Sequence, residues 1–324
     1  MISIEKISEI IENEIKQIDF KSTPSELYQP IYYALESGGK RIRPALALLA
    51  CNLFSESINE AILPAIGIEI FHNFTLLHDD IMDKADLRRN RATVHKKWSE
   101  NVAILSGDAM MIKSYDFFYN LSPDLFKKTF EVFNKTALQV CEGQQFDMNF
   151  ESIENVSQSD YLKMIELKTA VLLGASLKIG AMIGGADVKQ ADLLYDFGKN
   201  LGISFQLHDD YLDSFGNQDL FGKKIGGDIT ANKKTFLYIK ALELADSRVK
   251  KNLIELYSTS NIDHENKVKS VLDIFNDLNV KNVTLNEIDK YYNLANKSLQ
   301  VLDIDKSKLS IILAFVENLK NRKN

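Results

Sequence analysis

One long helix is predicted at residues 60–83, which have the sequence EAILPAIGIEIFHNFTLLHDDIMD. Apolar residues recur there every three or four positions, as they do on the buried face of an α-helix. These positions are Ile62, Ala65, Ile66, Ile70, Phe74 and Leu77. The helix ends in a cluster of aspartates, so a charged tip follows an apolar body. This contrast makes the end of the helix a candidate functional site.

The same period extends through most of the chain and predicts an all-α fold. Further helices are predicted near residues 43–54, 101–120, 124–149, 159–183, 188–213, 232–257, 264–278, 285–302 and 306–321, and an apolar stripe runs over residues 2–15. The chain has only five prolines, none of them after Pro123. Because proline breaks helix interiors at a cost of about 3 kcal/mol, its scarcity favours uninterrupted helices over a turn-rich β fold.

Local patterns indicate where some of these helices start. Pro44 suits the first turn of the helix near 43–54. Ser157, like its neighbours Asn155 and Ser159, is a plausible N-cap residue, and Thr284 with Glu287 has the pattern of a capping box. Polar stretches at 84–97 and 214–231 interrupt the helices, but no linker rich in serine, proline or glycine divides the chain. Residues 1–324 are therefore predicted to form a single domain.

Composition narrows the class of protein. The 324 residues include 39 Lys+Arg and 45 Asp+Glu, a net charge of −6, which gives no support for a nucleic-acid partner. Two cysteines do not make a disulfide scaffold. The acidic, amphipathic N-terminus lacks the pattern of a signal peptide, and no apolar run reaches the length of a transmembrane segment. A cytoplasmic protein is expected.

The aspartate cluster occurs twice in the same pattern. Residues 77–83 are LHDDIMD and residues 207–213 are LHDDYLD, both of the form L-H-D-D-x-x-D. Positions i and i+4 share a helix face, so Asp79 and Asp83 point together, and the second cluster repeats this geometry. Mg²⁺ is commonly held by one or two carboxylates together with water and substrate phosphates. Two such pairs on facing helices would make a site for Mg²⁺ ions and a diphosphate.

Cations accompany both clusters. They are Lys40, Arg41 and Arg43 in the segment GGKRIRP at 38–44, Arg88 and Arg89 after the first cluster, Lys168 within a predicted helix, and Lys223 and Lys233 around the stretch after the second cluster. Taken singly, each is better explained as a surface charge. Together, in an acidic protein, they indicate phosphate groups, which arginine grips with two hydrogen bonds and lysine as a point charge. Two diphosphates fit the pattern, one bound through Mg²⁺ and one bound directly.

From GGKRIRP to Lys233, these motifs resemble the trans-isoprenyl diphosphate synthases of the polyprenyl synthetase family in their order and spacing. The resemblance implies a helical bundle around a central cavity, the isoprenoid synthase type I fold, and a homodimer paired through long helices. It implies condensation of isopentenyl diphosphate with a C5–C15 allylic diphosphate to geranylgeranyl diphosphate (C20), with release of diphosphate. It also implies about three Mg²⁺ ions bound by carboxylates and phosphates, for which Mn²⁺ can substitute.

The resemblance also assigns residue roles. Mg²⁺ would be bound by Asp79, Asp83 and Asp209, with Asp80 and Asp213 nearby, and the allylic diphosphate by Arg88, Lys168, Lys223 and Lys233. Isopentenyl diphosphate would be held by Lys40, Arg43, His72 and Arg89. His72 lies two turns before Asp79 and within about 20° of it around the helix, which is consistent with one shared cavity. The family usually has glycine after the arginine pair; Asn90, which stands there, also tolerates a positive φ.

The implied mechanism needs no nucleophilic side chain. Mg²⁺ and cationic residues stabilise the departing diphosphate. The double bond of isopentenyl diphosphate attacks the resulting allylic carbocation, and the released diphosphate takes the proton. The catalytic set that the resemblance implies is Asp79, Asp83, Asp209, Lys168, Thr169 and Gln206, in which the oxygens of Thr169 and Gln206 stabilise the cation through their dipoles.

Product length is predicted from residues that precede the first cluster, because in this family the growing chain runs toward the start of the same helix. Thr75 is small and lies one turn before Asp79, whereas Phe74 is aromatic and Phe71 lies about 12 Å along the helix. An aromatic residue only at the fifth position before the cluster resembles one class of C20 synthase. Both phenylalanines could instead be ordinary core residues, and farnesyl diphosphate (C15) is a close alternative product.

Other functions stay open. A longer-chain polyprenyl diphosphate synthase has small side chains at both the fourth and the fifth position before the first aspartate. A class I terpene cyclase shares the first aspartate motif but usually lacks the second, as well as GGKRIRP. A non-catalytic subunit of a heteromeric synthase tends to lose the aspartates. A metal-dependent phosphohydrolase would use His78–Asp79 and His208–Asp209 pairs, but each histidine points about 100° away from its cluster face, which favours packing.

Overall fold

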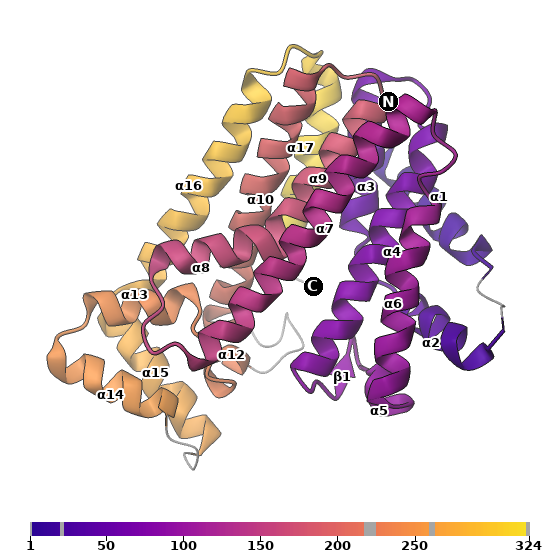
Figure 1. Ribbon diagram of the computed structural model, residues 1–324. Helices are drawn as coiled ribbons and strands as arrows, with labels where there is room; N and C mark the ends of the chain where they lie inside the picture. Colours follow the sequence, from indigo (N-terminus) through magenta and orange to yellow (C-terminus); the bar gives the residue numbers. More distant parts are fainter. Residues whose placement is uncertain (1, 20–22, 217–224, 259–262, 322–324) are drawn as a thin grey trace. The chain divides into compact units, whose positions relative to one another are not determined.

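The computed structural model describes residues 2–19, 23–216, 225–258 and 263–321, and most of them are helical (Figure 1). The all-α prediction is confirmed. Contacts divide the chain into two compact units, each made of separated segments: unit 1 holds Met1–Asn134, Ala175–Leu194 and Asp303–Phe315, and unit 2 holds Lys135–Gly174, Tyr195–Leu302 and Val316–Asn324. That residues 1–324 behave as a single domain stays a prediction.

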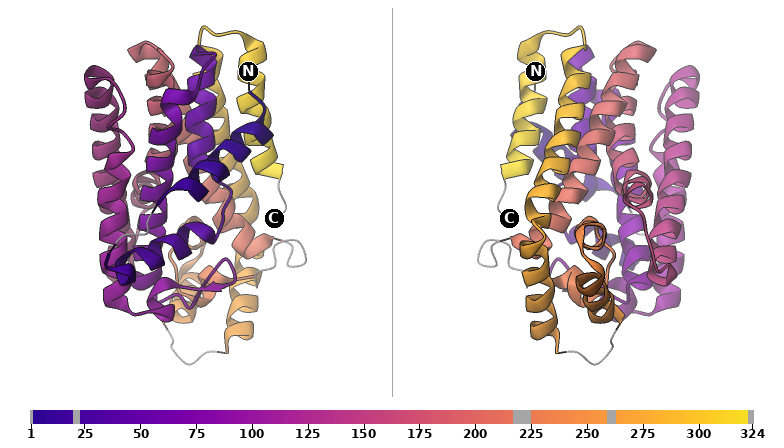
Figure 2. Two further views of the ribbon diagram at one scale, coloured as in Figure 1. Left: turned by 90° about the vertical axis from the view of Figure 1, so that its right-hand side faces the viewer. Right: turned by 90° about the vertical axis from the view of Figure 1, so that its left-hand side faces the viewer.

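The first eight elements belong to unit 1. They are α1 (Ile4–Gln17), α2 (Ser25–Glu36), α3 (Ile42–Phe54), α4 (Asn59–Met82), β1 (Leu87–Arg88), β2 (Arg91–Ala92), α5 (Val94–Lys97) and α6 (Glu100–Asp116). Four helices contribute residues to both units: α7 (Pro123–Ser152), α9 (Val171–Ile183), α10 (Val188–Phe215) and α17 (Lys306–Asn321). The N-terminal helix α1 lies against α3 and α4 (Figure 2).

Helix α4 is central to unit 1 and carries the first aspartate cluster at its end. It is apolar on nearly every side, so neighbouring helices must cover it, and it packs on α3 and α6. A Cβ atom at Gly67 would lie only 2.8 Å from Ser114 O on α6, so glycine permits this close approach. Within the described residues, α4 is long and apolar enough to cross a membrane, but 67% of its most apolar window is buried in the fold, as in a core helix.

Unit 2 is formed by the remaining elements around its own core. They are α8 (Gln158–Ile165), a π-helical segment η1 (Glu166–Ala170), α12 (Gly227–Thr230), α13 (Phe236–Leu244), α14 (Ser247–Ser258), α15 (His264–Asp277) and α16 (Val280–Gln300). Phe236, Leu253, Val271 and Phe275 from α13, α14 and α15 are fully buried in one hydrophobic cluster. This core supports the second aspartate cluster near the end of α10.

Several predicted boundaries differ from the structure. The predicted helix 232–257 is divided, because the Asp246 carboxylate accepts hydrogen bonds from the backbone N–H groups of Arg248 and Val249 and so starts a new helix, α14. The predicted capping box is wrong: Thr284 is buried inside α16, where its hydroxyl donates to Val280 O at 2.9 Å. Helix α2 was not predicted, since a proline lies inside it.

Two predicted helix starts are confirmed. The Ser157 hydroxyl accepts a hydrogen bond from the backbone N–H of Asp160 at 3.1 Å, so Ser157 is the N-cap residue of α8. Pro44 lies in the first turn of α3, as its missing N–H allows. The helix predicted over 159–183 is nevertheless not uniform, because η1 interrupts it at the residues singled out for catalysis.

Candidate active site

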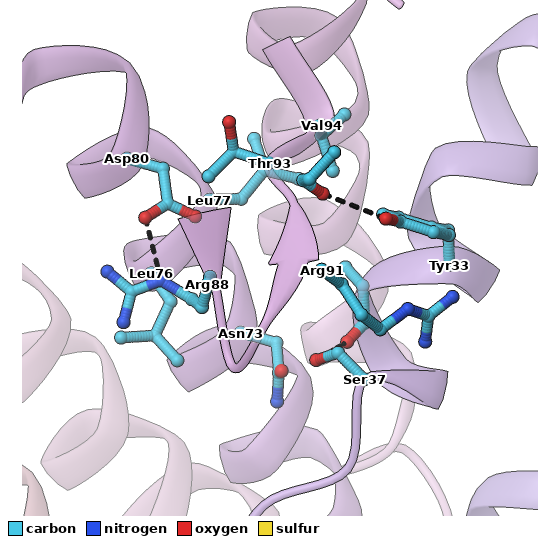
Figure 3. A pocket seen from close by; sticks show the side chains of 12 residues that line it. Tyr33, Ser37, Asn73, Leu76, Leu77, Asp80, Arg88, Arg91, Thr93 and Val94 are labelled. Carbon is cyan, nitrogen blue, oxygen red and sulfur yellow. Dashed lines mark hydrogen bonds and ion pairs between the residues drawn. The ribbon is translucent and has the colours of Figure 1, made fainter. Parts of the chain in front are cut away.

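The first aspartate cluster occupies the C-terminal end of α4. Asp83 is the C-cap residue and donates its backbone N–H to Asp79 O at 2.8 Å, so the two aspartates lie one turn apart on one face, as predicted. Asp80 is buried and accepts a hydrogen bond from Arg88 Nε at 2.7 Å (Figure 3). Arg88 Nη2 also lies 3.6 Å from Asp79 Oδ2. One arginine therefore holds two of the three carboxylates.

A short hairpin presents Arg88 and Arg89. Strands β1 and β2 pair antiparallel, with Arg88 opposite Arg91, and the two turn residues between them have positive φ: 52° for Arg89 and 61° for Asn90. Two successive left-handed residues are the mark of a type I′ turn, in which asparagine and glycine are favoured. The expectation that Asn90 accommodates this loop is confirmed.

Arg43, His72 and Arg89, which we call the arginine–histidine cluster, meet beside the glycine segment of unit 1. Arg43 Nη1 lies 2.9 Å from His72 Nε2. Because a guanidinium only donates, Nε2 must accept, and the imidazole proton is therefore on Nδ1. Arg89 donates to Gly38 O, and a Cβ atom at Gly39 would lie 2.7 Å from Arg89 Nη1. Three of the four residues predicted for isopentenyl diphosphate are thus brought together, and the fourth, Lys40, is exposed on the same segment.

A buried ion pair between Arg41 and Glu69 lies next to this cluster. Arg41 is 6% exposed, adopts a left-handed conformation at the N-cap of α3 (φ 45°), and donates to Glu69 Oε1 and to Glu12 Oε1, both at 2.9 Å. Glu69, on α4, also accepts from Asn73 Nδ2 at 3.2 Å. The pair ties the segment before Arg43 to the helix that carries His72.

The electrostatics of the cluster favour an anion. Burial, together with the charges of Arg43 and Arg89, holds the pKa of His72 well below its ordinary value, so its imidazole is neutral. Burial also lowers the pKa of Arg43 to about 10, partly offset by Glu69. Among the described residues, the buried Arg43 Nε has no hydrogen-bond partner. A buried, unsatisfied donor in a cationic cluster is suited to an anionic ligand.

The second aspartate cluster lies in unit 2, near the end of α10. Asp209 is exposed, and Asp213 Oδ2 accepts from the backbone N–H of Asp228 at 3.0 Å, in the first turn of α12. Asp210 is 4% exposed and accepts hydrogen bonds from Tyr161 Oη and from Gln206 Nε2. Burial and the nearby carboxylate of Asp228 raise the pKa of Asp210 to about 7.

Lys168 and Thr169 lie on the π-helical segment η1. Lys168 Nζ lies 2.6 Å from Asp147 Oδ2 on α7, and the Thr169 hydroxyl donates to Gln206 Oε1 on α10 at 3.2 Å. Glycines on both neighbouring helices make room for this segment: a Cβ atom at Gly143 would overlap the Lys168 backbone, and one at Gly202 would lie 2.6 Å from Ala170 Cα. Single-turn π segments often occur at functional sites.

The two lysines predicted near the second cluster have different outcomes. Lys223 lies outside the described residues. Lys233 is exposed just after α12, and its backbone N–H donates to Asp228 O at 2.9 Å. The adjacent Lys234 caps α7, because its ammonium donates to Phe150 O at 2.8 Å and to Ile153 O.

The residues predicted to set product length lie within unit 1. Phe71 is fully buried, and its ring centroid lies 5.4 Å from that of Phe74 and 5.3 Å from that of Phe133 on α7. Phe74 also packs edge-on against His78, whose Nε2 lies 3.1 Å from Ile104 O on α6. The Thr75 hydroxyl donates to His72 O at 2.8 Å. His78 therefore packs between helices, which argues against the His–Asp phosphohydrolase alternative.

The structure gives supporting roles to residues that the sequence interpretation left without a role. They are Arg41 and Glu69, which pair with each other next to the arginine–histidine cluster, Asp147, which pairs with Lys168, and Asp210, which is bonded to Gln206 and to Tyr161. A usable signal existed for Glu69, since a lone carboxylate inside an apolar helix is almost always paired. The others are ordinary polar residues whose partners come from distant segments.

The carboxylates suit Mg²⁺ of the kind that arrives with a phosphate substrate. Within the described residues, no group of three or more His, Cys, Asp or Glu side chains is arranged to hold a metal ion by itself. Each cluster instead has two carboxylates that are not buried, Asp79 with Asp83 and Asp209 with Asp213. That donor set fits a cation that keeps water and phosphate oxygens as its other ligands.

Comparison with known proteins agrees with these features. A family model described as polyprenyl synthetase matches residues 24–275. The geranylgeranyl diphosphate synthase of Methanosarcina mazei is 41% identical over 222 residues, 68% of each chain. The short chain isoprenyl diphosphate synthase of Methanothermobacter thermautotrophicus is 33% identical over 97% of this chain and 96% of its own. A crystal structure of a geranylgeranyl pyrophosphate synthase is 43% identical, with a TM-score of 0.94 over 100% of both chains.

Proposed function

The chain belongs to the polyprenyl synthetase family, and from that premise we propose that it condenses isopentenyl diphosphate with a C5–C15 allylic diphosphate to give geranylgeranyl diphosphate. The reaction depends on Mg²⁺ and releases diphosphate. One observation carries the proposal: helix α4 bears a carboxylate pair at its end and, two turns earlier, the neutral His72 beside Arg43. Unit 1 thus offers two kinds of diphosphate site, one acting through a cation and one direct.

The arginine–histidine cluster is proposed to bind isopentenyl diphosphate together with Lys40. Arg43 Nε is a buried donor without a partner among the described residues, and Arg89 occupies Gly38 O, a backbone acceptor that a phosphate oxygen would replace. Neutral His72 adds no charge of its own but can donate its Nδ1–H. These donors hold the diphosphate end, while the carbon chain stays free to react.

The aspartates and remaining cations are proposed to bind the allylic diphosphate. Mg²⁺ would be held by Asp79, Asp83 and Asp209, with Asp80 and Asp213 in support, and when bound it would neutralise charge that develops on the leaving diphosphate. Direct contacts would come from Arg88, Lys168, Lys223 and Lys233. Asp80 and Arg88 already hold each other at 2.7 Å, so Asp80 is better placed to orient Arg88 than to bind metal.

The remaining residues act on the reacting carbons. Lys168 is held by Asp147, which fixes its charge on η1. Thr169 and Gln206 present oxygens whose dipoles stabilise the allylic cation. The released diphosphate takes the proton that isopentenyl diphosphate loses, so no protein base is required.

The starter preference tests this proposal. With Mg²⁺ and isopentenyl diphosphate, we expect C5, C10 and C15 allylic diphosphates all to be consumed and to converge on one C20 product. Separation of the dephosphorylated products by chain length measures this. Conversion of the starters to their alcohols with release of phosphate and without elongation would support a phosphohydrolase, and a cyclic hydrocarbon would support a terpene cyclase.

Product length is expected to depend on Phe74. Replacing Phe74 by alanine removes a ring just before the aspartates, so products longer than C20 should appear; adding Phe71→Ala should extend them further. Because Phe71 is fully buried, its truncation should also lower stability by about 3–5 kcal/mol. Chain-length analysis of the products measures the effect. Phe118→Ala is the matched control, since Phe118 is as buried as Phe71 and its described ring contacts are with Phe130 and Phe133. Unchanged products in Phe74→Ala would contradict the role of Phe74.

A homodimer is proposed to form through α6. This helix exposes an apolar stripe about two turns long, in which the side chains of Leu105 and Ile112 are 60% and 58% exposed. Ile104, next to Leu105, and Tyr119, just after the helix, are also exposed. Such apolar exposure is typical of surfaces covered by another chain.

Charging this stripe should separate the dimer. We expect wild type to be dimeric and the variant Leu105→Glu/Ile112→Glu to be monomeric, because each carboxylate would be buried without a partner in the interface. Light scattering after size exclusion measures the mass. Val188→Glu, which alters an apolar residue 77% exposed at the start of α10, should stay dimeric. A monomeric wild type, or a dimeric double variant, would refute this interface.

We also propose that the protein acts in the cytoplasm, since both proposed substrates carry charged diphosphate groups.

A further inference from the structure

The middle aspartate of the second cluster differs from its neighbours. Asp210 is 4% exposed, whereas Asp209 is exposed. Both oxygens of the Asp210 carboxylate accept hydrogen bonds, Oδ2 from Tyr161 Oη and Oδ1 from Gln206 Nε2 at 3.2 Å. A carboxylate whose two oxygens are engaged inside unit 2 has little left to offer a metal ion.

The hydrogen bonds of Asp210 have a fixed direction. Because Asp210 accepts at both of its oxygens, the NH₂ group of Gln206 faces Asp210, and the Gln206 carbonyl oxygen faces Thr169. The Thr169 hydroxyl then has to donate its single proton to Gln206 Oε1, at 3.2 Å. The Thr169 hydroxyl can therefore present only its oxygen lone pairs to any other neighbour.

This direction matters for a reaction that passes through a cation. Oxygen lone pairs attract a developing carbocation, whereas an O–H or N–H dipole pointing toward it repels it. If the hydrogen bonds that run from Thr169 through Gln206 to Asp210 were reversed, the Gln206 NH₂ group would face Thr169. The hydroxyl proton of Thr169 would then be free to point elsewhere. The orientation of the Thr169 and Gln206 dipoles therefore depends on the buried carboxylate of Asp210.

Resting on the proposed function, we propose that Asp210 is a positioning residue, supported by Tyr161, that sets the hydrogen-bond direction of Gln206 and Thr169 and does not bind Mg²⁺. Tyr161 is itself buried and gives Asp210 a second donor, which locks the carboxylate in place. Asp210 thus orients the residues that face the reacting carbons, whereas Asp209 and Asp213 act on the Mg²⁺ that binds the diphosphate.

The variant Asp210→Asn tests the direction of the hydrogen bonds from Thr169 through Gln206 to Asp210. Asparagine keeps the size of the side chain. The proton of the buried Tyr161 hydroxyl has no other acceptor among the described residues, so it keeps the single asparagine oxygen, and the asparagine NH₂ then faces Gln206 and forces that amide to reverse. We expect kcat to fall about 10- to 100-fold, the usual effect of losing a residue that orients a functional group. The KM values for both diphosphates and the Mg²⁺ concentration at half-maximal rate should not change.

The exchange variant Gln206→Glu/Asp210→Asn should restore much of this activity. In it Tyr161 donates to the asparagine oxygen, the asparagine NH₂ donates to the new carboxylate, and Thr169 again donates its proton. Charge and volume match those of wild type. A residue with a merely structural role would not show this rescue, and neither would a metal ligand, because the exchange leaves position 210 without a carboxylate.

The outcomes separate the inference from the function on which it rests. If wild type does not elongate allylic diphosphates, the proposed function fails. If wild type elongates but Asp210→Asn keeps full kcat, or raises the Mg²⁺ requirement, or is not rescued by the exchange, the positioning role is refuted. Should Asp210→Asn not fold, Tyr161→Phe provides the test: it removes one donor, and a lower kcat with unchanged KM supports the role, whereas unchanged kcat overturns it.

Discussion

Replacing Asp79 by alanine is expected to lower kcat by about 10²- to 10³-fold, the loss seen when one group that stabilises transition-state charge is removed. The same result is expected for Asp209→Ala. Each substitution deletes a carboxylate at the end of a long helix, where Mg²⁺ bound to the allylic diphosphate would be held. Steady-state turnover with saturating isopentenyl diphosphate and farnesyl diphosphate measures the loss.

Neither substitution should unfold the protein. Asp209 is exposed, and the contact of Asp79 with Arg88 is long, at 3.6 Å, while Arg88 keeps its closer bond to Asp80. Asp86→Ala is the matched control: Asp86 follows the first cluster by three residues, is 80% exposed, and pairs only with the surface residue Lys96 in a described contact. Thermal unfolding should be nearly unchanged in all three variants. Near-normal turnover of Asp79→Ala or Asp209→Ala would contradict the assignment of the aspartates.

Replacing Glu69 by glutamine is expected to destabilise the protein by about 1–3 kcal/mol, because Arg41 loses its buried carboxylate and keeps only the more exposed Glu12 as an ion-pair partner in a described contact. Glu69 and Arg41 are 2% and 6% exposed, and their charged atoms lie 2.9 Å apart. Glu69 is also a charge that opposes the cations Arg43 and Arg89. Without it, Arg41, Arg43 and Arg89 would repel one another in a site with no bound anion.

Urea denaturation measures this loss, and an exposed pair provides the control. Glu9→Gln removes a carboxylate from the pair with Lys6, whose side chains are 58% and 57% exposed, so its effect should lie within about 1 kcal/mol. Adding inorganic diphosphate should recover part of the stability of Glu69→Gln, since an anion bound at the arginines offsets the lost charge. An effect of Glu69→Gln no larger than that of Glu9→Gln would show that the buried pair does not hold this site together.

The sequence was sufficient to predict the helical class and both aspartate clusters, since each depends on spacing alone. The period of α4 and the i, i+4 relation of Asp79 and Asp83 follow from 3.6 residues per turn. Where other forces decided the local structure, the prediction failed. α2 accommodates a proline in its interior, and Thr284 is buried within α16, where its hydroxyl bonds the preceding turn instead of capping a helix.

The supporting residues of the site could not be predicted in the same way. A π segment adds no visible change of period over five residues, so η1 is hidden inside a run that predicts a plain α-helix. Glu69 finds Arg41 28 positions away, and Tyr161 finds Asp210 49 positions away. Such pairs form only after the helices pack, and they decide which of several aspartates and arginines remain available to substrate.

The central claim is that this chain elongates an allylic diphosphate. It is tested most directly by incubating the wild-type protein with Mg²⁺, isopentenyl diphosphate and farnesyl diphosphate and determining the mass of the organic product. We predict geranylgeranyl diphosphate, formed together with an equal amount of diphosphate and absent when Mg²⁺ is chelated. Recovery of unextended farnesyl diphosphate, a cyclic hydrocarbon, or farnesol with free phosphate would contradict the account.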